Sequence, residues 1–220
     1  MKNQHALDVP KRTRYTVKEE MFNCISHGVG VLLAIAALVI LVVFATLKGD
    51  IWQIVSFSIY GATLILLYLF STLYHGIFNE KAKRVFRVFD HAAIYLLIAG
   101  SYTPLLLVFL RGAWGWAMFG IVWALAITGI IMNIVSLEGT RIFSTILYIL
   151  MGWVAVIAIK PMLDSVPPGL LRWIFTGGVI YTVGVLFYVW RKLPYHHGIW
   201  HLFVLGGSIV HFLGFLYYLG

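Results

Sequence analysis

The chain has 220 residues, of which 61% are hydrophobic and only 11% are charged. This composition excludes an ordinary soluble domain and indicates a membrane protein with several spans and no separate soluble domain. The net charge of +8 does not indicate nucleic acid binding, because the basic residues lie in short stretches between apolar segments. The single cysteine, Cys24, excludes an intramolecular disulfide.

The first 20 residues are polar, and seven apolar stretches follow, each close to the roughly 20 residues that cross a bilayer core. The first stretch is too long for a cleaved signal peptide, so we expect it to remain in the membrane. The connections are short, which forces neighbouring helices antiparallel. We therefore predict an all-α integral membrane protein, with a cytoplasmic polar tail over residues 1–20 and a seven-helix bundle over 21–220. The predicted helices are Met21–Leu47, Trp52–Phe78, Phe89–Leu110, Trp114–Val135, Ile142–Lys160, Leu170–Trp190 and His196–Leu219.

The positions of Lys and Arg predict the orientation of this bundle. Twelve of the sixteen lie in the N-terminal tail or at the connections after the second, fourth and sixth helices, which share one side of the membrane. Lys and Arg are enriched on the cytoplasmic side. The N-terminus is therefore expected in the cytoplasm and the C-terminus outside.

Ionisable and polar residues gather at the helix ends that this topology places on the cytoplasmic side. An ionisable group at membrane depth costs about 2.5–3.5 kcal/mol on insertion scales, so such a cluster is a candidate functional site. Its members come from the first helix (Asn23 and His27), the second (Ser71 and His75), the third (Asp90) and the seventh (His197 and His201).

His197 and His201 are four residues apart, so their side chains project from one helix face. The spacing suits two ligands of one metal ion, as in zinc proteases with a His-Glu-x-x-His motif. Here Gly198 follows the first histidine, so the protease general base is missing. The alternative is an interfacial pair that bonds to water and loops.

His75 adds a third imidazole at matching depth, and three histidines with an open position are a common catalytic zinc arrangement. Neutral imidazoles without thiolates favour Zn²⁺ over Ca²⁺ or Mg²⁺, while Fe, Ni and Cu stay open. His91 should point about 100° away from Asp90, and His211 lies about 15 Å beyond His201 along the helix, so neither is expected to bind the same ion.

Asp90 and Ser71 are the candidate catalytic residues beside this metal site. Asp90 is a candidate general base or acceptor for metal-bound water; the alternatives are a surface ion pair with Arg84 or Arg87, or a favourable place at a helix N-terminus. Ser71 lies one turn from His75 and can bond water or a substrate oxygen. Its alternative is a hydrogen bond to the carbonyl four residues back.

Four stretches together resemble the progestin and adipoQ receptor family, and specifically its bacterial haemolysin III branch. Their order, spacing and place in the topology match that family from about Glu20 to the C-terminus. They are EMFNCISHG at 20–28, STLYH at 71–75, FDHAAIYLLIAGSYTP at 89–104 and HGIWHLFVLGGSIVH at 197–211.

The resemblance implies a multi-pass, seven-helix protein of the bacterial plasma (inner) membrane with an inward N-terminus. It also implies Zn²⁺ held by His75, His197 and His201, with Asp90 at the metal-bound water and Ser71 beside it. The extended family includes alkaline ceramidases, which implies hydrolysis of a lipid amide as a class. The chain lacks the long N-terminal domain of the animal receptors, so hormone reception is not implied.

The function expected from these residues together with the resemblance is membrane homeostasis, through zinc-dependent hydrolysis of a lipid amide or ester by metal-bound water. Membrane lipids are the expected partners, with no nucleic acid and no soluble protein implied. Two alternatives stay open: a non-catalytic lipid sensor with structural zinc, and a cytolytic pore. The pore is disfavoured because the polar cluster lies on one side and no polar stripe runs along a helix.

Overall fold

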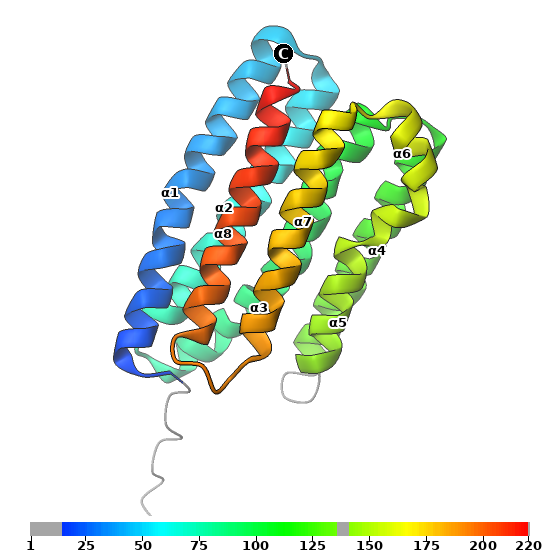
Figure 1. Cartoon of the computed structure of the whole chain (residues 1–220). Helices are drawn as coiled ribbons and strands as arrows, with labels where there is room; N and C mark the ends of the chain where they lie inside the picture. Colours follow the sequence, from blue (N-terminus) through cyan, green and yellow to red (C-terminus); the bar gives the residue numbers. More distant parts are fainter. Residues whose placement is uncertain (1–14, 136–140, 220) are drawn as a thin grey trace, which may run out of the picture.

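The computed structural model describes residues 15–135 and 141–219, which form an antiparallel bundle of helices (Figure 1). The predicted connection at 136–140 and most of the predicted N-terminal tail lie outside these residues. The elements are α1 (Val17–Lys48), α2 (Ile51–Gly76), α3 (Glu80–Pro104), the π-helical turn η1 (Leu105–Phe109), α4 (Ala113–Val135), α5 (Arg141–Gly152), the 3₁₀ turn η2 (Val154–Ala158), α6 (Ile159–Ser165), α7 (Pro168–Val189) and α8 (His196–Tyr217).

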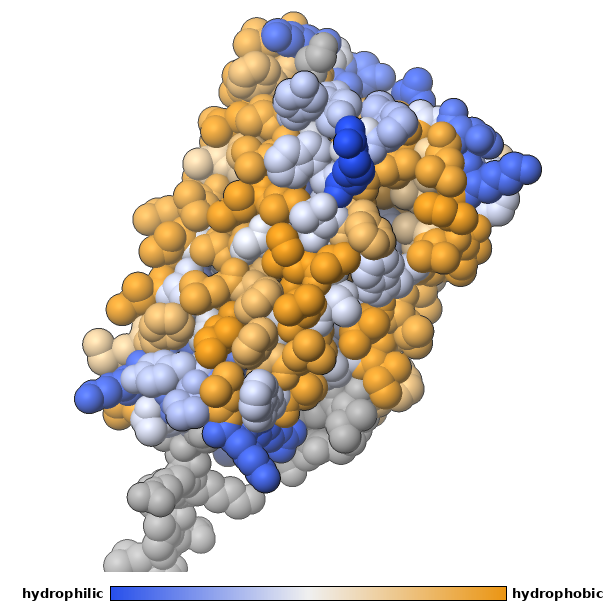
Figure 2. All heavy atoms as spheres, in the orientation of Figure 1, coloured by the Kyte–Doolittle hydropathy of each residue, from blue (hydrophilic) through white to orange (hydrophobic). Residues whose placement is uncertain are grey.

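Within the described residues, seven helical segments are long and apolar enough to cross a membrane. The third span joins α3 to η1, and the fifth consists of α5, η2 and α6. Figure 2 shows apolar side chains over the middle of one face and hydrophilic residues gathered toward the two ends of the bundle. This distribution is that of a protein that spans a bilayer. The predicted seven-transmembrane-helix bundle is therefore confirmed.

The third span begins nine residues earlier than predicted, because the charged stretch expected to be a loop is helical. The Asn79 side chain caps this helix by accepting hydrogen bonds from the backbone N–H groups of Lys81 and Ala82. A charged helical turn is tolerated there because water can solvate it beyond the apolar core. The extension also brings Lys83 Nζ to within 2.9 Å of the Glu20 carboxylate on α1.

Two spans contain an irregular turn: η1 lies in the third span and η2 in the fifth. Pro104 ends α3 directly before η1. The fifth span was expected to be one helix to Lys160, but it breaks after Gly152 and continues to Ser165. The Tyr102 hydroxyl donates to the Gly152 carbonyl at 2.7 Å and accepts from the Ala155 N–H at 3.2 Å, which satisfies backbone groups freed by the break.

The ends that carry the candidate residues meet at one end of the bundle, opposite the C-terminus (Figure 1). Helices α1, α3 and α8 begin there and α2 ends there. At this end α1 and α8 approach closely across Gly198. A Cβ atom on Gly198 would collide with the Phe22 ring and lie 3.0 Å from the Asn23 Oδ1 atom. Gly198, at the position where zinc proteases have glutamate, therefore has a packing role.

Gly198→Ala is accordingly expected to destabilise the bundle by about 1–3 kcal/mol, because overpacking forces α1 away from α8. Gly206→Ala, on the same helix, is the matched control. A Cβ on Gly206 lies 3.7 Å from Ile180, an ordinary contact, so that variant should unfold at the wild-type temperature or slightly above it. Thermal unfolding of both variants in detergent measures this, and equal unfolding temperatures would contradict it.

Candidate metal centre

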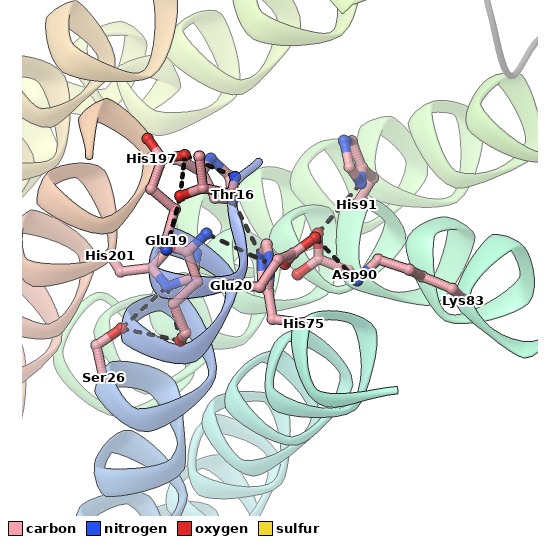
Figure 3. Close-up of polar contacts among 11 residues, drawn as sticks. Thr16, Glu19, Glu20, Ser26, His75, Lys83, Asp90, His91, His197 and His201 are labelled. Carbon is pink, nitrogen blue, oxygen red and sulfur yellow. Dashed lines mark hydrogen bonds and ion pairs between the residues drawn. The ribbon is translucent and has the colours of Figure 1, made fainter. Parts of the chain in front are cut away.

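Three buried histidines from two helices meet at the end of the bundle where α8 begins. His75 is in the last turn of α2, and His197 and His201 are in the first two turns of α8. Each offers a ring nitrogen, and these nitrogens lie within 4.8 Å of one another. The Nε2 atoms of His75 and His197 are 3.2 Å apart. We call these residues the three-histidine group (Figure 3).

Hydrogen bonds at the outer ring nitrogens indicate which nitrogens are available inside the group. His75 Nδ1 donates to Glu20 Oε2 at 2.6 Å, and His201 Nδ1 donates to the Asn23 carbonyl at 3.2 Å. Each neutral ring carries one N–H, so the Nε2 atoms of His75 and His201 keep their lone pairs. A ring nitrogen with a free lone pair is the form that binds a metal ion.

The geometry and chemistry of this group fit a zinc ion. Two nitrogens bound to one tetrahedral zinc at about 2.0–2.1 Å lie about 3.3 Å apart, close to the separation of the His75 and His197 Nε2 atoms. The same separation suits an N–H···N hydrogen bond between two metal-free rings. Three buried imidazoles without a thiolate match the His₃ donor set of catalytic zinc sites. The group can therefore hold a metal ion.

A cavity of about 140 Å³ opens beside the three-histidine group. Apolar and aromatic side chains from α3, α5, α7 and α8 form most of its wall. Ser71, Asp90, His197 and His201 line it together, so both candidate catalytic residues face the same space as two of the three histidines. Such an apolar space with a few polar groups at one end suits an amphipathic ligand.

The Asp90 carboxylate, at the wall of this cavity, contacts the ring of the next residue. Its Oδ2 atom lies 3.2 Å from His91 Nδ1, which also donates to the Arg87 carbonyl at 2.8 Å. The surface ion pairs with Arg84 or Arg87 that the sequence left open are not among its contacts within the described residues. Asp90 is buried, so its carboxylate is shielded from bulk water.

Ser71 Oγ is buried and has no hydrogen-bond partner within the described residues. The hydrogen bond to the carbonyl four residues back, its alternative role, is therefore not made. The neighbouring Thr72 does make that bond, to the Tyr68 carbonyl at 2.7 Å. A buried hydroxyl without a partner costs about 1–3 kcal/mol, so Ser71 is available to a water or a ligand in the cavity.

His27 and Asn23, the candidate lining residues of α1, both reach the site. The His27 ring stacks on the His201 ring with centroids 3.5 Å apart and planes 11° from parallel. Neither His27 ring nitrogen has a hydrogen-bond partner among the described residues, although the side chain is buried and lines the cavity. Asn23 contributes its backbone carbonyl to His201 and its side-chain amide near His75.

Several residues at the site, among them Glu20 and Tyr15, were missed by the sequence analysis. Glu20 contacts His75, and Tyr15 stacks on the His197 ring with centroids 5.1 Å apart. Glu20 was assigned to the polar tail, but it lies three residues before Asn23 and seven before His27, a spacing that puts all three on one face of a helix. That spacing was the available signal for Glu20, whereas no comparable pattern indicated Tyr15.

The remaining described histidines contact backbone carbonyls away from the three-histidine group. His211 donates to the Ile174 carbonyl at 3.1 Å and lines another part of the cavity wall. His196 donates to the Phe187 carbonyl at 3.2 Å, and His91 has the Arg87 contact described above. His5 lies outside the described residues.

Comparison with known proteins places this architecture in a family. The model of a family described as haemolysin-III related matches residues 15–212. The chain is 48% identical over 204 residues to a Hemolysin-3 homolog of Bacillus subtilis (strain 168), covering 93% of this chain and 96% of that protein. It is also 48% identical over 210 residues to Hemolysin-3 of Bacillus cereus, covering 94% of this chain and 96% of that protein.

A more distant relative is the Monocyte to macrophage differentiation factor of Homo sapiens, 30% identical over 218 residues, which cover 96% of this chain and 89% of that protein. The family match includes every segment that contributes to the three-histidine group. The chain belongs to the haemolysin-III related family.

Proposed function

We propose that this protein is a zinc-dependent hydrolase that cleaves an amide or ester bond of a membrane lipid at the cytoplasmic side of the plasma membrane. The observation that carries the proposal is that Ser71, Asp90, His197 and His201 line one mainly apolar cavity, with His75 completing the metal-binding group. This arrangement puts hydrolytic groups beside space for an acyl chain.

His75, His197 and His201 would hold the ion, and Asp90 and Ser71 would act on the reacting atoms. A zinc ion held there would supply a Lewis acid and would lower the pKa of a nearby water to about 7. The Asp90 carboxylate accepts a proton from the attacking water and later returns it to the leaving amine or alcohol. The Ser71 hydroxyl donates to the scissile carbonyl oxygen as negative charge develops there. The apolar wall binds the acyl chain and excludes bulk water.

The orientation predicted from Lys and Arg supports a site on the cytoplasmic side. Four of the basic residues in that count, Lys81, Lys83, Arg84 and Arg87, lie on the α3 extension, at the same end of the bundle as the three-histidine group. A lipid of the inner leaflet then has its head group at the depth of the three-histidine group and its chain at the depth of the apolar wall. The site therefore suits a substrate taken directly from the membrane.

We expect purified wild-type protein to release free fatty acid from at least one member of a panel of lipid amides and esters. Chelation of zinc should abolish the release, and added zinc should restore it. His201→Ala, which lacks one proposed ligand, is the matched control and should stay inactive when zinc is added. Mass spectrometry of released fatty acid measures all four samples. No release from any lipid by folded, zinc-loaded protein would overturn the hydrolase.

One observation also supports a non-catalytic role for the same site. The three-histidine group joins α2 to α8, and hydrogen bonds from α1 hold two of its rings, so a bound metal ion would tie three helices together. A bundle tied in this way can bind a lipid in the cavity without cleaving it. If the role is non-catalytic, the purified protein would bind zinc and retain intact lipid, and it would release no fatty acid.

A cytolytic pore, the third candidate function, would need an aqueous path across the membrane; the names of the two Bacillus relatives refer to lysis. The cavity wall in the described part of the chain is mainly apolar and aromatic, which does not favour such a path. We therefore rank lysis below the hydrolase and the lipid-binding protein. Ion conductance in pure bilayers that persists after zinc removal would reverse this ranking.

A further inference from the structure

Glu20, in the first turn of α1, joins three helices through its two carboxylate oxygens. Oε2 accepts the 2.6 Å hydrogen bond from His75 Nδ1 on α2, and Oε1 lies 2.9 Å from Lys83 Nζ on α3 (Figure 3). The His75 side chain is fully buried, and that of Glu20 is 13% exposed. A partly buried carboxylate in this setting needs a partner of opposite charge, and Lys83 is already such a partner.

The contact between Glu20 and His75 therefore has a second effect besides charge compensation: it selects the tautomer of the His75 ring. A neutral imidazole carries its proton on one nitrogen and binds a metal ion through the other. With Nδ1–H donated to Glu20, the lone pair is on Nε2. That atom lies 3.2 Å from His197 Nε2, inside the three-histidine group.

The side chain of Asn23 makes the role of Glu20 specific. Its Nδ2 atom, a donor, lies 3.5 Å from the same His75 Nδ1. Without Glu20, this amide would donate to an unprotonated Nδ1 and so favour the tautomer that carries its proton on Nε2. That tautomer has no lone pair facing the three-histidine group and cannot bind an ion there. Glu20 thus opposes a competing donor that already lies beside this nitrogen.

The same helix orients a second ring. His201 Nδ1 donates to the Asn23 carbonyl at 3.2 Å and lies 3.1 Å from Ser26 Oγ, whose own hydroxyl donates to that carbonyl at 2.9 Å. Two turns of α1 thus hold the outer nitrogens of histidines from α2 and α8. By contrast, His197 Nδ1 has no hydrogen-bond partner in the described part of the chain.

We propose that Glu20 is a positioning residue of the metal site, which accepts the Nδ1–H of His75 and thereby keeps His75 Nε2 available to the ion. Lys83 holds the second oxygen of Glu20 and fixes the direction of the carboxylate. The inference rests on the metal site proposed above. Partners of this kind typically contribute 10- to 100-fold to metal affinity, because they set both the tautomer and the direction of the ring.

Two substitutions at Glu20 separate its acceptor from its charge. Glu20→Met removes both, and we expect zinc affinity to fall by about 10- to 100-fold. Glu20→Gln keeps a neutral carbonyl acceptor of nearly the same shape, so its affinity should lie between wild type and Glu20→Met. Glu19→Gln removes the same charge one residue away. Glu19 bonds to Thr16 and to the Tyr195 N–H and should leave zinc affinity unchanged.

Competition for zinc between detergent-purified protein and a chelator of known affinity measures all four proteins, with thermal unfolding of the metal-free forms beside it. The graded order at matched unfolding temperatures supports the inference. Wild-type affinity in a folded Glu20→Met protein overturns it and leaves the metal site standing. A folded wild type that binds no zinc overturns the metal site as well, so the two failures are distinguishable.

Where Glu20→Met does not fold, the metal-free wild type still gives an answer. The ¹⁵N chemical shifts of the His75 ring distinguish its two neutral tautomers. A proton on Nδ1 supports the inference, and a proton on Nε2 overturns it, because Glu20 would then leave the inner nitrogen blocked.

Discussion

His75→Ala is expected to reduce bound zinc from about one ion per chain to a trace, because a catalytic zinc site of this type has only three protein ligands. The same loss is expected for His197→Ala and His201→Ala, since the three rings converge on one point. Elemental analysis of detergent-purified protein, normalised to protein concentration, measures the metal content. The result would establish which element the three-histidine group holds and that one ion requires both α2 and α8.

His211→Gln is the matched control for this experiment. His211 is also a buried histidine of α8, but it donates to the Ile174 carbonyl and lies outside the three-histidine group. Its replacement should leave the zinc content unchanged. Equal zinc in wild type and in a folded His75→Ala protein would place the ion elsewhere, and the proposed mechanism would lose its basis.

Asp90→Asn is expected to retain zinc and to lower lipid turnover by about 10²- to 10⁴-fold, the usual contribution of a general acid–base residue. Asparagine has nearly the same shape as aspartate, so it preserves the cavity wall, but its amide cannot take up a proton from water. The ratio of turnover per bound zinc, from fatty acid release and elemental analysis of the same sample, isolates this effect from loss of metal.

The contact between Asp90 and the His91 ring provides the control. His91→Gln removes that neighbour but keeps the carboxylate at the cavity, so we expect turnover per zinc to remain well above that of Asp90→Asn. Wild-type turnover in Asp90→Asn would exclude Asp90 as the proton acceptor. Loss of zinc together with turnover would instead make Asp90 a residue that holds the ion in place.

Several features of the fold were predictable because they depend on the chain alone. Seven apolar stretches of spanning length must form helices, since backbone groups in a bilayer core need hydrogen bonds within their own segment. Short connections then alternate the direction of these helices. For that reason alone, residues as distant in sequence as His75 and His201 could be expected at one end of the bundle, where the structure brings them together.

Helix ends were less predictable, because an apolar stretch indicates which residues lie in the membrane core but not where the helix begins and ends. The α3 extension from Glu80 is charged but remains helical, with a cap at Asn79. The break after Gly152 lies within an apolar run, and the partner that satisfies its backbone, Tyr102, is 50 residues away in the chain. Hydropathy along the sequence therefore indicates neither the cap at Asn79 nor the break after Gly152.

The sequence by itself determined the number of spans, their alternation and the end of the bundle at which the polar residues meet. Only the tertiary structure decided which polar atoms face one another: Glu20 on His75, His27 stacked on His201, and Ser71 left without a partner beside the cavity. The physical reason is that hydrophobic patterning sets the depth of a residue in the membrane. Its contacts depend on the rotation and separation of neighbouring helices, and close packing across residues such as Gly198 sets these.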